Sequence, residues 1–221
     1  MKTIISLAAT LMITGCSGIT NNNQMNTLPD TLQIGQSILS RDTVEQVAYP
    51  TLTQEQCLTL HDQTKRDVPK GTQLIGVRSV GNGMTLAAYK MPMSEDSNHF
   101  KVYLLTTNSK DDVIDNIDLG EFHTSEHQGP LRFGGNRFYT TDADLHFDSI
   151  GNFTVHRVMT LTSLFLKNHT LTEMWRVEWI DNYVIDNTGH FLFKGQQETL
   201  RTPTDLNDPT IDDFKARFIS K

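Results

Sequence analysis

FTVHRVMTLTSLFL (residues 153–166) and MWRVEWIDNYVI (residues 174–185) are two runs of strand-forming residues, separated by a polar segment that begins KNHT (167–170). The second run alternates apolar with charged side chains, and successive side chains of a strand point to opposite faces of a sheet. Its apolar face carries Trp175, Val177 and Trp179. The pattern predicts a strand buried on one side, paired with the first run in an antiparallel hairpin.

Shorter runs nearer the N-terminus extend this pattern. The segments 77–80 and 84–90 flank Gly81-Asn82-Gly83, and an Asn-Gly pair between two strand-forming runs is typical of a tight hairpin. Further runs of the same kind are 99–107, 113–119 and 138–147. Each of these runs is predicted to be a β-strand, with turn residues between them.

Two helices are predicted, one on each side of the strands. Thr53 followed by Gln56 fits a capping box, in which each side chain bonds the other residue's backbone N–H, and predicts a helix over 53–66. Asp208-Pro209 is typical of a helix start, and a short C-terminal helix with one apolar face is expected there. That face carries Ile211, Phe214 and Phe218.

These elements predict a mainly β fold. We expect a single antiparallel β domain over residues 45–221, either a sandwich or an incomplete barrel, with one helix before the sheet and a short helix at the C-terminus. The pattern Asp-x-x-Gly-x-Phe occurs at 148–153 and again at 186–191. It fits either propeller-like blades or two similar hairpin turns, and two copies favour the turns because a closed array needs more.

Composition excludes several classes of protein. The chain has 221 residues, 19 Lys and Arg against 26 Asp and Glu, and a formal net charge of −7. Nucleic-acid binding needs a basic surface that displaces counterions from phosphate, so no nucleic-acid partner is expected. With two cysteines, Cys16 and Cys57, the chain has neither a disulfide-dense scaffold nor a multi-cysteine metal site.

The N-terminus has the features of a secretory signal. Lys2 precedes an apolar run of about ten residues, which is too short to span a bilayer. The run ends in Ile13-Thr14-Gly15-Cys16, which resembles the lipobox of bacterial lipoproteins. No family is recognised for the rest of the chain.

The lipobox resemblance implies cleavage before Cys16, which would then carry the acyl chains that anchor the protein. It divides the chain into a signal peptide (1–15), a lipidated tether (16–44) and the globular domain (45–221). Several acyl chains on one residue give nearly permanent membrane attachment. Ser17 stands where an Asp would resemble an inner-membrane retention signal, so the outer membrane is the expected location and the inner membrane the alternative.

Two segments contain residue types that bind metals. His123, Glu126 and His127 match H-x-x-E-H, the pattern of the inverted zinc peptidases, which requires both histidines on one helical face. Gly120 and Gly129-Pro130 are incompatible with such a helix, and a solvated loop is favoured. The other segment, with Asp142, Asp144 and Asp148, resembles a calcium loop but has Phe147 where the loop requires glycine. We therefore predict no metal site and no cofactor.

Three other features have a functional and a structural interpretation. Cys57 has His61 one helical turn away, as a thiol nucleophile requires, but a structural cysteine is favoured. Trp175 and Trp179 would stack on a sugar or peptide if exposed, and burial is favoured. Gly134-Gly135-Asn136 fits a ligand-gripping loop or a hairpin turn, and the turn is favoured.

The sequence contains no P-loop, dinucleotide fingerprint or nucleophile elbow. The expected function is therefore that of an outer-membrane lipoprotein acting as a non-enzymatic binding or assembly module. Its expected partners are the membrane, through the anchor, and an envelope protein or glycan. The alternatives are an envelope hydrolase, with no catalytic residue identified, and an inhibitor or immunity protein for a basic partner, which the acidic net charge suits.

Overall fold

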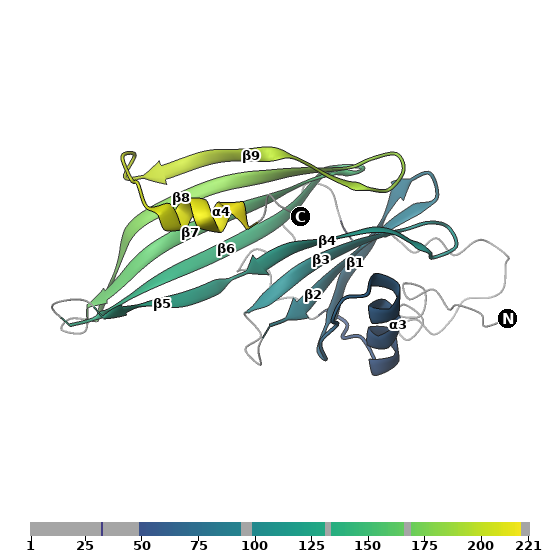
Figure 1. Cartoon of the computed structure of the whole chain (residues 1–221), viewed down its shortest axis with the longest axis horizontal. Coiled ribbons are helices and arrows are strands. Elements are labelled where there is room, and N and C mark those ends of the chain that lie inside the picture. The colour runs from purple at the N-terminus through teal and green to yellow at the C-terminus, as the bar shows by residue number, and fades with distance from the viewer. Residues whose placement is uncertain (1–31, 33–48, 94–98, 131–133, 166–168, 218–221) are drawn as a thin grey trace, which may run out of the picture.

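The computed structural model describes residue 32 and residues 49–93, 99–130, 134–165 and 169–217 (Figure 1). The predicted signal peptide and Cys16 lie outside these residues. In chain order the elements are α3 (Gln54–Thr64), β1 (Gln73–Gly81), β2 (Met84–Pro92), β3 (Phe100–Thr107), β4 (Val113–Phe122), β5 (Thr124–Pro130), β6 (Asn136–Ser149), β7 (Asn152–Phe165), β8 (Thr170–Ile185), β9 (Phe191–Thr202) and α4 (Pro209–Ala216).

The strands form two open antiparallel sheets. Sheet one has the order β1-β2-β3-β4 and sheet two the order β5-β6-β7-β8-β9, so within each sheet every strand pairs with its neighbours in sequence. β7 and β8 pair from Asn152↔Val184 to Phe165↔Thr170, as predicted for the hairpin. The mainly β fold, with one helix before the strands and a short one after them, is confirmed.

The two sheets are connected through a nearly continuous strand. β4 pairs with β3 in sheet one, β5 pairs with β6 in sheet two, and only His123 separates them. The backbone of His123 has φ 54°, a left-handed conformation that redirects the chain. The expected solvated loop over 123–127 is wrong, because residues 124–130 form an edge strand, where glycine and proline are tolerated.

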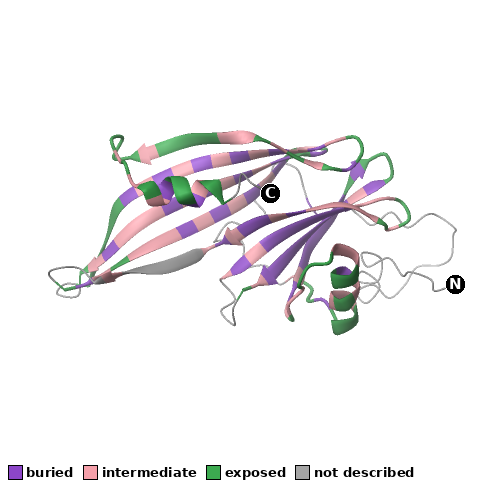
Figure 2. Ribbon diagram, viewed as in Figure 1, coloured by how far each residue is buried: buried purple, intermediate pink, exposed green. Residues whose placement is uncertain are grey.

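The two sheets share one apolar core. Leu86, Phe100 and Leu104 of sheet one contribute to it, together with Leu145 and Phe153 of sheet two. The other face of sheet one is covered by α3, whose Leu60 is fully buried. β2 and β3 are therefore buried on both faces, whereas much of β6 and β7, and β8 from Trp175 onward, alternate between buried and half-buried residues (Figure 2).

Leu32 belongs to this core although it comes from the range expected to be tether. It is buried, its N–H donates to the Val77 carbonyl at 3.2 Å, and its own carbonyl accepts from Arg78. The chain is thus fixed to strand β1 at this residue.

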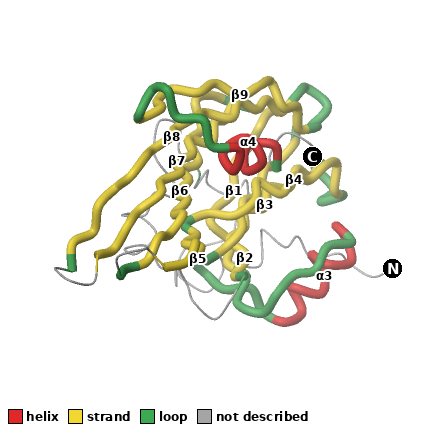
Figure 3. Tube along the Cα trace, turned by 60° about the vertical axis from the view of Figure 1, so that its left-hand side comes forward, coloured by secondary structure: helices red, strands yellow, loops and turns green. Residues whose placement is uncertain are grey.

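Sheet two extends beyond sheet one, and α4 packs against the extended part (Figures 1 and 3). Ile211 and Phe214 of the helix contact Trp175, Val177 and Trp179 of β8. The predicted helix start is confirmed, because the Asp208 carboxylate accepts from the Thr210 N–H and Pro209 follows it.

A charged cluster also holds α4 against β9. Glu198 of β9 accepts hydrogen bonds from Arg201 at 2.7 Å and is ion-paired with Lys215 of the helix. The hydrogen bonds from Arg201, followed by those from Lys215, lower the pKa of the Glu198 carboxyl to about 2.

A buried ion pair lies in sheet two, between the core that is shared with sheet one and the cluster under α4. Arg157 of β7 and Asp181 of β8 are 2% and 0% exposed, and Arg157 Nε donates to Asp181 Oδ2 at 2.7 Å. Arg157 also donates to the Leu119 carbonyl and lies over the Phe122 ring, and Gln196 donates to the second oxygen of Asp181 at 2.7 Å. Every charge of the pair is satisfied, as burial demands.

The repeated Asp-x-x-Gly pattern forms hairpin turns, not propeller blades. One copy joins β6 to β7 and the other joins β8 to β9. In the second copy Asp186 accepts from Thr188 and from the His190 N–H, and these hydrogen bonds lower the pKa of its carboxyl to about 2. The turn is fastened to sheet one, since Thr106 Oγ1 donates to the Gly189 carbonyl at 2.6 Å.

Gly189 provides a test of this turn. Its φ is 92°, and a Cβ would lie 2.8 Å from Ile114 Cδ1 and 2.9 Å from Met84 Sδ. Gly81 has φ 90°, and a Cβ there would have nothing within 4 Å. It is therefore a matched control that measures the cost of the left-handed backbone alone. Alanine at either position should cost about 1–2 kcal/mol for the left-handed backbone. Gly189→Ala should cost about 1–3 kcal/mol more, because it overpacks the contact between turn and sheet. Urea unfolding of both variants measures the difference, and equal losses would contradict this account.

Candidate functional site

The outer face of the extended part of sheet two, opposite α4, contains a groove of about 620 Å³. Apolar side chains of three strands line it: Phe138, Val158 and Leu171. A row of threonines from β6 and β7 crosses its floor: Thr140, Thr160 and Thr162. The Thr140 and Thr160 hydroxyls contact each other directly. The groove therefore combines apolar walls with hydrogen-bonding hydroxyls, a composition common in binding sites.

The charges around the groove are predominantly acidic. Asp142, Glu173 and Arg176 line it. Arg176 Nε donates to Glu178 Oε1 at 2.6 Å, and its Nη1 lies 3.8 Å from Glu173 Oε2. Strand alternation places Asp144 and Glu178 on the same face, so among the described residues of β6, β7 and β8 the carboxylates on this face outnumber the Arg176 guanidinium.

An exposed apolar group lies at the far end of β7 and β8, and one of its members, Leu171, lines the groove. It consists of Phe165, Leu171 and Met174, which are 36%, 67% and 52% exposed. We call these three residues the apolar tip. Leu164 stands opposite Leu171 in the register, so alternation turns the next residue, Phe165, to the other face of the sheet. The apolar tip thus exposes apolar area at the end of the sheet, and exposed apolar area of this kind is typical of an interaction site.

His123, the first residue of the H-x-x-E-H pattern, serves a structural role at the strand junction. Its Nδ1 lies 2.9 Å from Asp142 Oδ1, its side chain is 7% exposed, and its ring is 5.4 Å from that of Phe100. The side chains of Glu126 and His127 lie outside the described part of the structure. Because 124–130 form a strand, residues four apart are separated by about 13 Å, and the helical zinc arrangement is not formed.

The calcium-like segment also lies in a strand. Asp142 and Asp144 belong to β6, and Asp148 is exposed near its end. An EF-type loop is therefore not formed. The described residues contain no group of three or more His, Cys, Asp or Glu side chains positioned to hold a metal ion.

The other candidate residues have structural positions. Cys57 is half-buried beside the cluster under α3, and burial raises the pKa of its thiol, which disfavours the nucleophilic thiolate. His61 Nδ1 donates to the Arg66 carbonyl at 2.6 Å instead of activating a nucleophile. Trp175 and Trp179 are buried under α4, so the predicted burial is confirmed for both and neither ring is available to stack on a ligand.

Gly134-Gly135-Asn136 belongs to a hairpin connection. Pro130 of β5 is paired with Asn136 of β6, and both glycines have positive φ. The turn interpretation is confirmed.

The groove itself was not identified from the sequence. Its residues come from three strands and meet only once the register is fixed. The available signal was the alternation along each strand, which places Thr140, Asp142 and Arg176 opposite the apolar face.

Neither described helix has the length and apolar character needed to cross a membrane. Comparison of the chain with protein-family models, with curated proteins and with solved structures found no match.

Proposed function

We propose that the protein is an outer-membrane lipoprotein, anchored through Cys16, whose domain binds an envelope protein through the groove and apolar tip of sheet two. In this role it is a binding or assembly module and not an enzyme. The observation that carries the proposal is the apolar tip, three large apolar side chains exposed at the end of sheet two, of which Leu171 also lines a groove with acidic margins.

The chemistry of the surface indicates the partner. Phe165, Leu171 and Met174 provide apolar area, which favours a protein partner over a glycan. Asp142 and Glu173 provide negative charge, which favours lysine or arginine side chains opposite them. A basic partner would also suit an inhibitor or immunity protein, and the same acidic margin favours that second candidate function.

The anchor and the surface have complementary roles in this proposal. The lipobox Ile13-Thr14-Gly15-Cys16 supports attachment at the N-terminal side, where Leu32 fixes the chain to sheet one. The apolar tip lies at the end of sheet two that extends past sheet one. A partner bound there would be held at a distance from the anchored end.

Site-specific photocrosslinking in intact envelopes tests the proposal. A photoreactive residue is placed at Leu171 in the full chain and, as a matched control, at Ile150, which is 66% exposed but lies on the turn after β6. We expect one crosslinked protein from position 171 and none from position 150. Glu173→Lys should weaken this crosslink, and raised salt should weaken it too because the attraction is screened.

A Cys16→Ser form tests the anchor separately. It should leave the membrane fraction and lose the crosslink in intact envelopes. The crosslink should return when the soluble form is mixed with the partner in solution. Equal crosslinking at 171 and 150, or none at either, would overturn the proposed surface. Retention of the Cys16→Ser form in the membrane fraction would overturn the anchor.

A further inference from the structure

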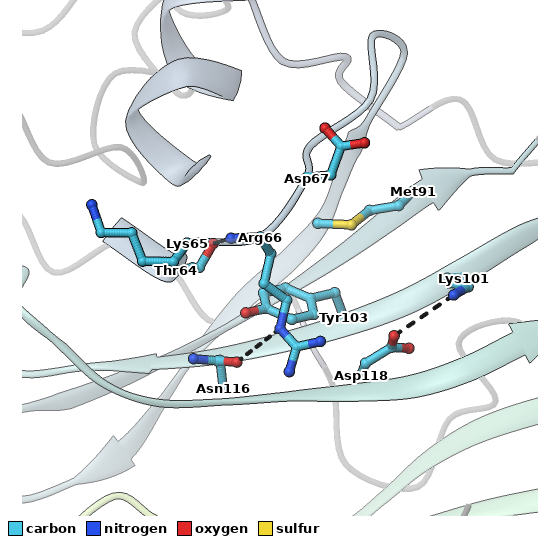
Figure 4. A pocket seen from close by; sticks show the side chains of 9 residues that line it. All are labelled: Thr64, Lys65, Arg66, Asp67, Met91, Lys101, Tyr103, Asn116 and Asp118. Atoms are coloured by element: carbon cyan, nitrogen blue, oxygen red, sulfur yellow. Dashed lines mark hydrogen bonds and ion pairs between the residues drawn. The ribbon is translucent and has the colours of Figure 1, made fainter. Parts of the chain in front are cut away.

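A second pocket lies on the other sheet, at the end of helix α3. It has a volume of about 480 Å³ and lies between the segment after the helix and the outer face of β3 and β4 (Figure 4). Tyr103 of β3 stands directly opposite Asp118 of β4 in the strand register. The pocket is thus built on paired strands, and this size is typical of sites for small molecules.

Arg66 is the residue around which the pocket is organised. Lys65 ends the helix in a left-handed conformation with φ 57°, which turns the chain back over the sheet. The Arg66 N–H donates to Thr64 Oγ1 at 3.3 Å, and its carbonyl accepts from His61 at 2.6 Å. Both backbone polar groups of Arg66 are therefore held by the helix end.

Neutral groups position the Arg66 side chain. Its Nε donates to Asn116 Oδ1 at 3.3 Å, and its guanidinium carbon lies 5.4 Å from the centre of the Tyr103 ring. Within the described residues, no carboxylate forms an ion pair with it. An arginine oriented by an amide and an aromatic ring keeps its full charge for an incoming anion.

The other charged side chains of the pocket determine its net charge, and hence the charge of the ligand that it would balance. Lys101 Nζ lies 3.9 Å from Asp118 Oδ2, so these two groups compensate each other. Figure 4 shows Arg66 reaching in toward Tyr103 and Asn116, whereas Lys65 and Asp67 point away from it. One positive charge is left, which balances a monoanion better than the dianion of a phosphomonoester.

The polar groups around Arg66 suit hydroxyls. The Asn116 amide, the Asp118 carboxylate and the Thr64 hydroxyl line the same pocket. Amide and carboxylate oxygens accept hydrogen bonds from hydroxyl groups, and the planar guanidinium binds a carboxylate through two parallel bonds.

We propose that this pocket binds the carboxylate of an acidic sugar, with Arg66 as the anchoring residue and Asn116 and Asp118 as partners of the sugar hydroxyls. This site is distinct from the groove and apolar tip, and the proposal does not depend on the function proposed for them.

Ligand-observed saturation-transfer NMR on the full chain tests the proposal, with D-glucuronate as the probe and D-glucose as its neutral analogue. Glucuronate should bind, and glucose at least about tenfold more weakly, because the charge-assisted bonds are lost. Arg66→Gln should weaken glucuronate binding by about tenfold or more. Arg66→Lys should also weaken it, since lysine lacks the bidentate fork.

Arg217→Gln is the matched control. Arg217 lies over the Phe214 ring at 5.2 Å on α4, so its removal also deletes an arginine stacked on an aromatic ring, but at another place in the fold. It should leave glucuronate binding unchanged. Equal loss in Arg66→Gln and Arg217→Gln, or equal binding of glucose and glucuronate, would overturn the site. Tighter Arg66-dependent binding of inorganic phosphate than of glucuronate would overturn the ligand class.

Discussion

Asp181→Asn will lower the free energy of unfolding by about 3–5 kcal/mol, because it removes the carboxylate charge that compensates the buried Arg157 guanidinium inside sheet two. Asparagine has nearly the same shape as aspartate, so the loss reports charge and not volume. The amide oxygen of the new asparagine would still accept the hydrogen bond from Gln196. The loss of stability is therefore confined to the interaction with Arg157.

Urea unfolding followed by circular dichroism measures this loss. Glu173→Gln is the control, since that carboxylate is 49% exposed and 3.8 Å from Arg176, and exposed pairs contribute about 0–1 kcal/mol. The double variant Arg157→Met/Asp181→Leu should recover most of the stability, because apolar residues of similar volume replace buried pairs at little cost. If Asp181→Asn costs no more than Glu173→Gln, the pair contributes no more than a surface ion pair.

Phe214→Ala should cost about 3–5 kcal/mol and release helix α4 from sheet two. Phe214 is buried, and its ring meets that of Trp179 edge-to-face at 6.1 Å between centres. The helix has only eight residues, and a helix that short depends on tertiary packing for its stability.

Tryptophan fluorescence reports this release directly. The chain has two tryptophans, and both lie in the cluster under α4. The emission of Phe214→Ala should shift to longer wavelength as water reaches Trp175 and Trp179. Phe165→Ala makes the same chemical change at a residue 36% exposed and should leave the emission in place. An unshifted spectrum for Phe214→Ala would mean that β8 buries its tryptophans without the helix.

The strands predicted from sequence were those with strong alternation. The 153–185 hairpin, the Gly81-Asn82-Gly83 turn and both helix starts were correct because each depends on local chemistry. β5 and β9 were not predicted. Both are edge strands, and β9 is half-buried or exposed along its whole length, so no buried face imposed an apolar period on its sequence.

The polar interior was predictable in part. Arg157 and Asp181 both occupy inward positions of their strands, so alternation alone marks two charges for burial. Their contact depends on the register of β7 against β8. Arg157 pairs with Trp179, so Asp181 lies on the neighbouring strand two residues beyond the position opposite Arg157. The Arg66 pocket was beyond sequence reasoning, because Arg66 is bonded to Asn116, 50 residues away on another element.

The order of strands in the two sheets bears on how the chain folds. Since each strand pairs only with its sequence neighbours, the sheets can form by adding one hairpin after another, with no long connection to close first. The nearly continuous β4–β5 strand, with the left-handed residue His123 at its centre, is the connection between the two sheets. A topology of this kind would suit the export that we propose from the lipobox, because every folding step uses segments that emerge consecutively.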